Sequence, residues 1–75
     1  MTPIERAVEL AGGQTSLATL IGVTPSFVSQ WVTGARPIPA TRCIAIEAAT
    51  TGRVTREELR PDVFGEVRVA QAIAT

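Results

Sequence analysis

The stretch that decides the fold is residues 14–33, with the sequence QTSLATLIGVTPSFVSQWVT. Ala18 offers the small side chain that two closely crossing helices need, and Gly22, four residues later, permits the positive φ of a tight turn. Apolar residues before and after the glycine give each helix a face toward a core: Leu17, Ile21, Val23, Val28 and Trp31. This pattern predicts a helix-turn-helix, whose second helix enters the DNA major groove. An ordinary helical hairpin without a DNA role is the alternative.

Cap and turn signals divide the rest of the chain into short helices. Thr2, followed by Pro3 and Glu5, forms a capping box, and Thr55 with Glu58 forms another. Glycines follow the helical stretches, and two prolines predict an extended link over residues 35–39. The expected helices cover residues 2–11, 14–21, 24–33 and 40–50, with a last short helix from 55 that Pro61 limits. The predicted fold class is all-α, a compact bundle of about five short helices.

The length sets the number of domains. Seventy-five residues make one small domain, and a content of 45% hydrophobic and 19% charged residues excludes wholesale disorder. We expect a DNA-binding domain over residues 1–62. Residues 63–75 form a tail that fits a helix or a strand and that is a candidate contact for a second subunit or another partner.

Charge and composition exclude several classes of function. Seven arginines and seven carboxylates give a net charge of zero, which excludes a polybasic surface that binds any polyanion. The charges are unevenly placed, because residues 14–35 carry none while residues 36–60 carry a net +2. This distribution suits a polyanionic partner beside the second half of the chain, or it is ordinary surface charge.

The chemistry needed for catalysis is also scarce. The chain has no His and a single Cys, so we expect no intramolecular disulfide, no metal site and no cofactor. Its scattered carboxylates provide no acid–base or nucleophile–base pair, so we expect that it is not an enzyme. No signal-peptide pattern opens the sequence, and the apolar runs fall far short of the roughly 20 residues that span a bilayer. A reducing cytoplasm, in a bacterium or as a phage product, is the expected location, without membrane association.

The outward face of the helix over 24–33 is the predicted base-reading surface. Its side chains are small or amide-bearing, with no carboxylate to repel phosphate: Pro25, Ser26, Ser29, Gln30 and Thr33. Gln30 suits paired hydrogen bonds to an adenine edge, and the serines can donate or accept at several bases. For each serine, a solvated helix face is the alternative.

Phosphate contacts require donors at helix starts and cations beside the groove. The candidates are Gln14, Thr24, Arg36, Thr41 and Arg42. The start of the helix at Thr24 adds free N–H groups and the positive end of the helix dipole. With so few cations, we expect about three or four neutralised phosphates per subunit and a shallow salt dependence for a monomer.

Other conspicuous residues are predicted to be structural. The spacing of Trp31 places it in the core, and Cys43 is expected to be a small buried apolar residue. Phe27 either shields the seam between helices, which we favour, or touches a thymine methyl group. Arg60 and Asp62 flank a proline, and we favour a structural role for them over a DNA contact: Arg60 would pair with a nearby carboxylate, and Asp62 would cap the next turn.

The sequence resembles the YdaS/Cro-like family of small phage and prophage regulators over about residues 1–64. The matching runs are Gly22-Val23-Thr24-Pro25, Val28-Ser29-Gln30-Trp31, Arg36-Pro37-Ile38-Pro39, Arg42-Cys43, Ile46-Glu47, Ala49-Thr50, Gly52, Val54-Thr55 and, most specifically, Leu59-Arg60-Pro61-Asp62. The resemblance implies a lambda-repressor-like all-α fold, operator binding and, in some members, an antitoxin role. It maps recognition residues onto Pro25, Ser26, Ser29 and Gln30. The chain departs from relatives that carry a basic residue at position 33 and glycine at position 35.

Two functions are therefore expected. The first is a sequence-specific DNA-binding transcriptional regulator, a Cro-like and autoregulatory repressor. It would bind double-stranded DNA as a homodimer at a near-palindromic operator, with the tail or the last helices forming the dimer surface. The alternative is an antitoxin that neutralises a toxin protein, for which the apolar tail would be the contact. One chain can combine both roles.

Overall fold

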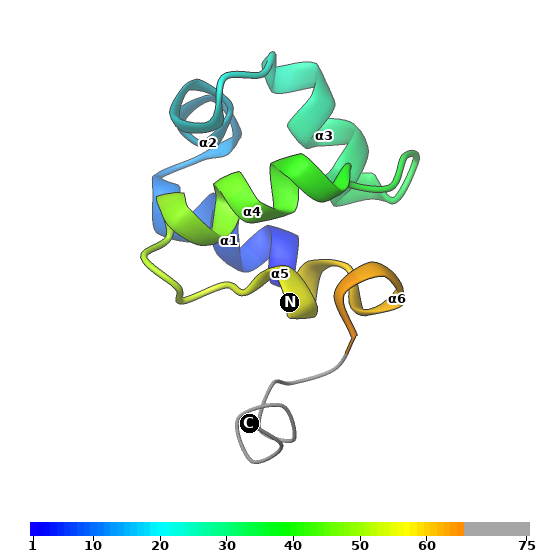
Figure 1. Ribbon diagram of the computed structural model, residues 1–75. Helices are drawn as coiled ribbons and strands as arrows, with labels where there is room; N and C mark the ends of the chain where they lie inside the picture. Colours follow the sequence, from blue (N-terminus) through cyan, green and yellow to red (C-terminus); the bar gives the residue numbers. More distant parts are fainter. Residues whose placement is uncertain (66–75) are drawn as a thin grey trace.

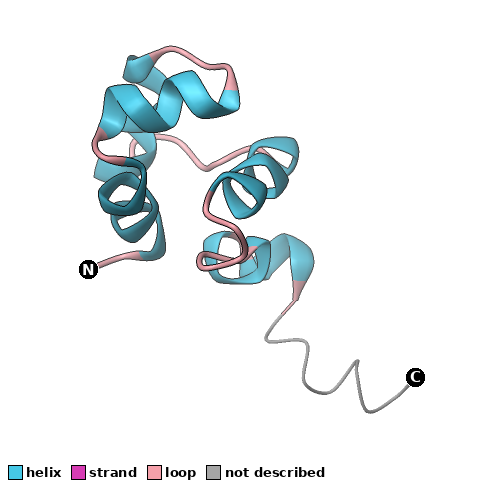
Figure 2. Ribbon diagram, turned by 90° about the vertical axis from the view of Figure 1, so that its left-hand side faces the viewer, coloured by secondary structure: helices cyan, strands magenta, loops and turns pink. Residues whose placement is uncertain are grey.

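The computed structural model describes residues 1–65, which form six helices joined by short turns (Figures 1 and 2). In chain order they are α1 (Pro3–Ala11), α2 (Gln14–Ile21), α3 (Pro25–Thr33), α4 (Ala40–Ala49), α5 (Arg56–Leu59) and α6 (Pro61–Phe64). The all-α prediction is confirmed, and residues 1–65 include no strand. None of these six helices has the length and apolar content to cross a membrane.

Both predicted capping boxes are present. The Thr2 hydroxyl accepts from the Glu5 amide at 3.2 Å, and the Glu5 carboxylate accepts from the Thr2 amide at 2.7 Å. Thr55 and Glu58 repeat this exchange at the start of α5, at 3.2 and 3.1 Å. The backbone hydrogen bonds from Thr2 and Thr55 hold the pKa values of Glu5 and Glu58 below their ordinary value. Local signals in the sequence thus fix where α1 and α5 begin.

The core forms around α2, which packs against α1, α3 and α4. Its buried members are Ile4, Ala7, Leu17, Ala18, Ile21, Val28, Trp31, Ile38, Cys43, Ile46 and Val54. Trp31 and Cys43 are 6% and 0% exposed, which confirms both core predictions. Burial raises the pKa of the Cys43 thiol to about 11, so this side chain stays neutral in the interior.

Ion pairs attach the short α5 to the helices around it. Glu47 of α4 accepts from the backbone amide and the Nε of Arg56, at 2.8 and 3.0 Å. Arg6 of α1 donates to the Arg53 carbonyl at 2.8 Å and lies 3.1 Å from a carboxylate oxygen of Glu58. These contacts position a helix of four residues that is too short to be stable alone.

Helix α6 is the element beyond the predicted five. Pro61 ends α5, as predicted, but a proline also suits the first position of a new helix, and α6 begins there. Phe64 packs against the core, and the Arg56 guanidinium lies 5.8 Å from the centroid of its ring. The helical chain therefore continues past the predicted domain boundary at residue 62. The predicted tail contacts fall mainly on residues 66–75, which lie outside the described residues.

Candidate nucleic-acid interface

A three-residue turn joins α2 to α3. Gly22 adopts φ +78°, a left-handed conformation that favours glycine, and its amide donates to the Ala18 carbonyl at 2.9 Å. The Val23 amide donates to the same carbonyl at 3.0 Å, and its side chain packs against the core. Thr24 then takes an extended conformation before Pro25 begins α3. The sequence Gly-Val-Thr-Pro thus forms the tight turn of a helix-turn-helix, with the two helices at the same end of the molecule (Figure 1).

The five predicted base-reading residues lie together on α3. Pro25, Ser26 and Thr33 are exposed, whereas Ser29 and Gln30 are partly buried. The opposite side of the helix carries the buried Val28 and Trp31, so the helix presents an uncharged face away from the core.

Gln30 lies on the outer face of α3 with its side chain partly buried. Its Oε1 is buried and has no hydrogen-bond partner among the described residues. An unsatisfied buried amide oxygen of this kind costs on the order of 1–3 kcal/mol. Helical spacing places the residue on the exposed face but does not report how far its side chain folds back, so sequence reasoning missed this feature. Rotation of the amide outward would give the oxygen access to a donor.

No side chain of the described residues accepts a capping hydrogen bond from the backbone N–H groups in the first turn of α3. Thr24 is the N-cap residue by its backbone angles, but its side chain makes no capping bond. Instead, the Thr24 and Ser26 hydroxyls lie 3.0 Å apart and share a hydrogen bond. Thr24, Pro25 and Ser26 therefore surround a helix start that carries a partial positive charge.

Arg42 has a structural contact that the sequence did not reveal. Its Nη1 donates to the carbonyl of Ile21, the last residue of α2, at 3.2 Å. This bond connects the start of α4 to the turn between α2 and α3. The remaining guanidinium N–H groups make no hydrogen bond within residues 1–65, and the side chain is partly exposed. Arg42 thus combines a structural contact with a cationic group at the surface.

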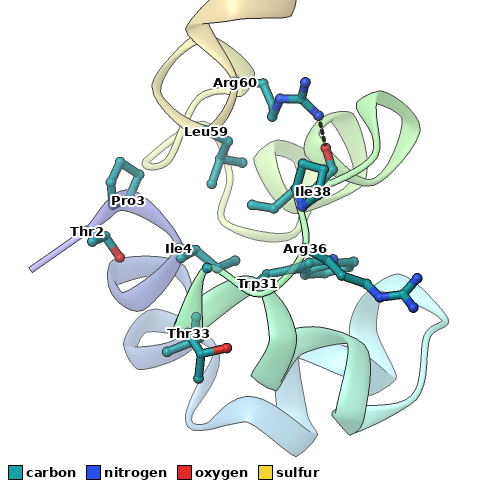
Figure 3. A pocket seen from close by; sticks show the side chains of 12 residues that line it. Thr2, Pro3, Ile4, Trp31, Thr33, Arg36, Ile38, Leu59 and Arg60 are labelled. Carbon is teal, nitrogen blue, oxygen red and sulfur yellow. Dashed lines mark hydrogen bonds between the residues drawn. The ribbon is translucent and has the colours of Figure 1, made fainter.

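The other predicted phosphate contacts are exposed. Gln14 begins α2 and Thr41 lies in the first turn of α4. Arg36 lies in the link between α3 and α4, and its backbone amide donates to the Gln30 carbonyl at 3.3 Å. Its side chain has no ion pair or hydrogen bond within the described part of the chain and extends away from Arg60 and the other labelled residues in Figure 3.

Behind Arg36, a hollow of about 440 Å³ lies at the carboxyl end of α3 (Figure 3). Trp31, Ile38 and Leu59 line it with apolar surface. Arg60 pairs with Asp62 through two bonds of 3.0 and 2.7 Å, which confirms the predicted pairing of Arg60 with a nearby carboxylate. The predicted cap from Asp62 is wrong, because α6 begins without a side-chain cap from the described residues. The Arg60 guanidinium also donates to the Ile38 carbonyl at 2.8 Å, which was not predicted and which fixes the α3–α4 link. The bond from Arg60 lowers the pKa of Asp62.

Phe27 is neither fully packed nor free. The residue is 46% exposed, although packing was the favoured prediction. Together with Val23, Trp31, Pro39 and Arg42 it lines a shallow hollow of about 190 Å³ between α3 and the start of α4. Its inner side therefore shields the seam between the helices, while its outer side remains open.

The fold and this surface define a small helix-turn-helix protein. The chain belongs to the YdaS family, because the family model described as "Bacterial toxin YdaS" matches residues 4–68. A relative in Escherichia coli (strain K12), "Putative transcriptional regulator YdaS", is 52% identical over 59 residues, which cover 79% of this chain and 60% of the relative. The chain thus spans less than two thirds of that relative's length.

A solved structure shows the same fold. It is the "Structure of the Cro protein from putative prophage element Xfaso 1 in Xylella fastidiosa strain Ann-1". The match has a TM-score of 0.79 and 46% identity, and it covers 87% of this chain and 98% of that one. These findings confirm the predicted resemblance to YdaS and Cro-like proteins. The regulator names also agree with the expectation that the chain is not an enzyme.

Proposed function

We propose that this protein is a transcriptional regulator that binds specific sites in double-stranded DNA and reads the major groove with α3. The observation that carries the proposal is the uncharged outer face of α3, held outward by the Gly22 turn in a Cro-like fold. The relative's name and the solved Cro structure both support a regulatory role.

The proposed base contacts come from five residues: Pro25, Ser26, Ser29, Gln30 and Thr33. Gln30 carries most of the discrimination, because a rotated amide can both donate to and accept from an adenine edge. Such a contact also supplies the partner that its buried Oε1 lacks in the free protein. Ser26 and Ser29 adapt to several bases, and Pro25 and Thr33 offer apolar carbon atoms to the groove.

The proposed phosphate contacts flank this face: Gln14, Thr24, Arg36, Thr41 and Arg42. Arg36 is the most available cation, because its side chain is exposed and bonds to no other described residue. Arg42 contributes the part of its guanidinium that Ile21 does not use. Two arginines per subunit give a modest electrostatic contribution, so specificity rests on base contacts and on subunit number.

A homodimer on a near-palindromic operator is part of the proposal. A nine-residue recognition helix covers few base pairs, and two copies related by a two-fold axis would read half-sites about one helical turn apart. Selection of binding sites from random double-stranded DNA with the purified protein tests the function. We expect an enriched sequence with inverted symmetry, and footprinting should protect a matching site in the protein's own promoter region at low salt. Recovery of no enriched sequence would contradict the proposal.

A second candidate is a role in a toxin–antitoxin pair, which the word toxin in the family description favours. The antitoxin alternative requires a contact with a partner toxin and places it in the tail. Deletion of residues 66–75 spares α6, so it tests the tail without removing Phe64 from the core. An antitoxin should rescue growth when its partner toxin is expressed, and the deletion should abolish that rescue. Growth arrest by the chain expressed alone would instead favour a toxic activity.

A further inference from the structure

Phe27 is the residue whose exposure neither the fold nor the proposed polar contacts explain. The residue is 46% exposed, although it also lines a hollow beside Val23 and Trp31. Exposed aromatic surface is unfavourable in water, and burying it in a complex recovers that free energy. The Phe27 ring therefore offers an apolar contact beside proposed base-contacting side chains that are polar.

Phe27 borders the proposed DNA-binding surface. Phe27 precedes Gln30 by three residues, so the two side chains are neighbours on α3, separated by about 60° around the helix axis. On its other side, the hollow of about 190 Å³ ends at Pro39 and Arg42, at the start of α4. Phe27 is therefore a neighbour of one proposed base contact and shares a hollow with one proposed phosphate contact.

We propose that Phe27 recognises the 5-methyl group of a thymine in the major groove. This inference rests on the proposed DNA-binding function and names a further specificity-determining residue within it. The thymine methyl is the apolar group that a base edge presents in that groove, and aromatic side chains are suitable partners for it. First-turn residues of a recognition helix lie close to base edges, and Phe27 is the third residue of α3. The polar Gln30 and the apolar Phe27 would thus read neighbouring features of an A·T-containing half-site.

Replacement of single thymines by deoxyuridine tests this contact, because it removes the methyl group and leaves base pairing unchanged. The probe is the duplex selected with the purified full chain, and the affinity is measured for each substituted position. We expect a loss of about fourfold at one thymine of each half-site, the value for one buried methyl group, about 0.8 kcal/mol. With Phe27→Ala, the thymine and deoxyuridine duplexes should bind equally at that position, whereas Phe27→Leu should retain part of the preference.

Leu10→Ala is the matched control. Leu10 is 44% exposed, but it lies beside Ala49 and Arg53 at the opposite end of α4 from Arg42. This variant should keep the full deoxyuridine effect. Circular dichroism and thermal unfolding of each variant separate a lost contact from a lost fold.

Four results would overturn the inference. A selected site that depends on Gln30 but tolerates deoxyuridine everywhere would leave the proposed function standing and remove the thymine contact. An undiminished deoxyuridine effect in Phe27→Ala would assign the methyl group to another residue. A change in oligomeric state of Phe27→Ala without DNA would show that the ring belongs to a subunit contact. Failure to select any site would contradict the inference and also the proposed DNA-binding function on which it rests.

Discussion

The Arg42 guanidinium donates to the Ile21 carbonyl at 3.2 Å and so joins the start of α4 to the end of α2. The two residues are 21 positions apart, and the bond lies beside the turn that directs α3 outward. In the proposed complex the same side chain faces the DNA backbone. The position of the recognition helix and the phosphate contact thus depend on one residue.

Arg42→Ala should weaken binding to specific and random DNA by a similar factor, because phosphate contacts carry no sequence information. The slope of log affinity against log salt should become shallower by about 1 per subunit. Loss of the bond to Ile21 should also reduce the free energy of unfolding by about 0.5–1.5 kcal/mol. Titrations at several salt concentrations and denaturant unfolding measure both effects.

Arg53→Ala provides the control for that experiment. Arg53 is exposed, its side chain pairs with no other described residue, and it lies beyond the carboxyl end of α4, where it shares a hollow with Ala49. Its removal changes the net charge equally and should leave the salt slope unchanged. An equal change of slope in both variants would show that Arg42 acts through the overall charge alone.

Gly22→Ala should destabilise the fold by about 1–2 kcal/mol. An added Cβ would meet no atom within 4 Å, so the alanine causes no steric clash. The loss of stability arises because the backbone at φ +78° is unfavourable for a residue with a Cβ. Gly22→Asn should lose less, because Asn tolerates the left-handed region. Urea unfolding of the three proteins should give this order, and equal stability of the alanine variant would contradict the assigned turn.

Acid should destabilise the protein partly through Glu58. Hydrogen bonds from Thr55 and Arg6 lower its pKa from the ordinary value of 4.5, so the folded state binds its proton less readily than the unfolded state. This contribution is fully present above about pH 4.5 and is lost as the pH falls through the lowered value. Glu58→Gln can keep the capping geometry while removing the charge.

Unfolding midpoints of wild type and Glu58→Gln from pH 7 to pH 3 test this linkage. The variant should be less stable by under about 1 kcal/mol at neutral pH, since Arg6 and Glu58 are 42% and 35% exposed. The difference should shrink toward pH 3. A constant difference over the whole range would contradict the assigned charge effect.

Arg60 and Asp62 should differ in their effect on thermal stability. Arg60→Ala removes the ion pair and the bond to the Ile38 carbonyl, whereas Asp62→Asn leaves the second bond in place. The melting temperature should therefore fall further in Arg60→Ala. The same fall in both variants would mean that the contact with Ile38 adds no stability.

The features that could be predicted from the sequence are those set by neighbouring residues. The Thr2–Glu5 and Thr55–Glu58 boxes act over three positions, and the core position of Trp31 follows from helical periodicity. The missed features are mostly contacts over long separations. The bonds from Arg42 to Ile21 and from Arg60 to Ile38 join an arginine to a distant backbone carbonyl, which any residue type provides. No pattern of side chains in the sequence predicts such a partner.

The candidate DNA-binding site likewise has features that the sequence predicts and features that it does not. The face of α3 follows from spacing, and the structure brings Pro25, Ser26, Ser29 and Thr33 together with Gln30 as the spacing requires. The buried Oε1 of Gln30 depends on its side-chain torsions and on the packing around it, which spacing does not determine. The exposed fraction of Phe27 likewise depends on where the α3–α4 link and Pro39 lie.

The affinities of Gln30→Ala and Gln14→Ala for the selected operator and for random duplex DNA show whether α3 reads bases in the major groove. Loss of the Gln30 amide should cost about 1–3 kcal/mol on the operator and little on random DNA, because that side chain reads a base. Gln14→Ala, at the start of α2, should weaken both by the same factor, as expected for a phosphate contact. Equal losses on both duplexes for Gln30→Ala, in a folded protein, would contradict the claim that α3 reads the major groove.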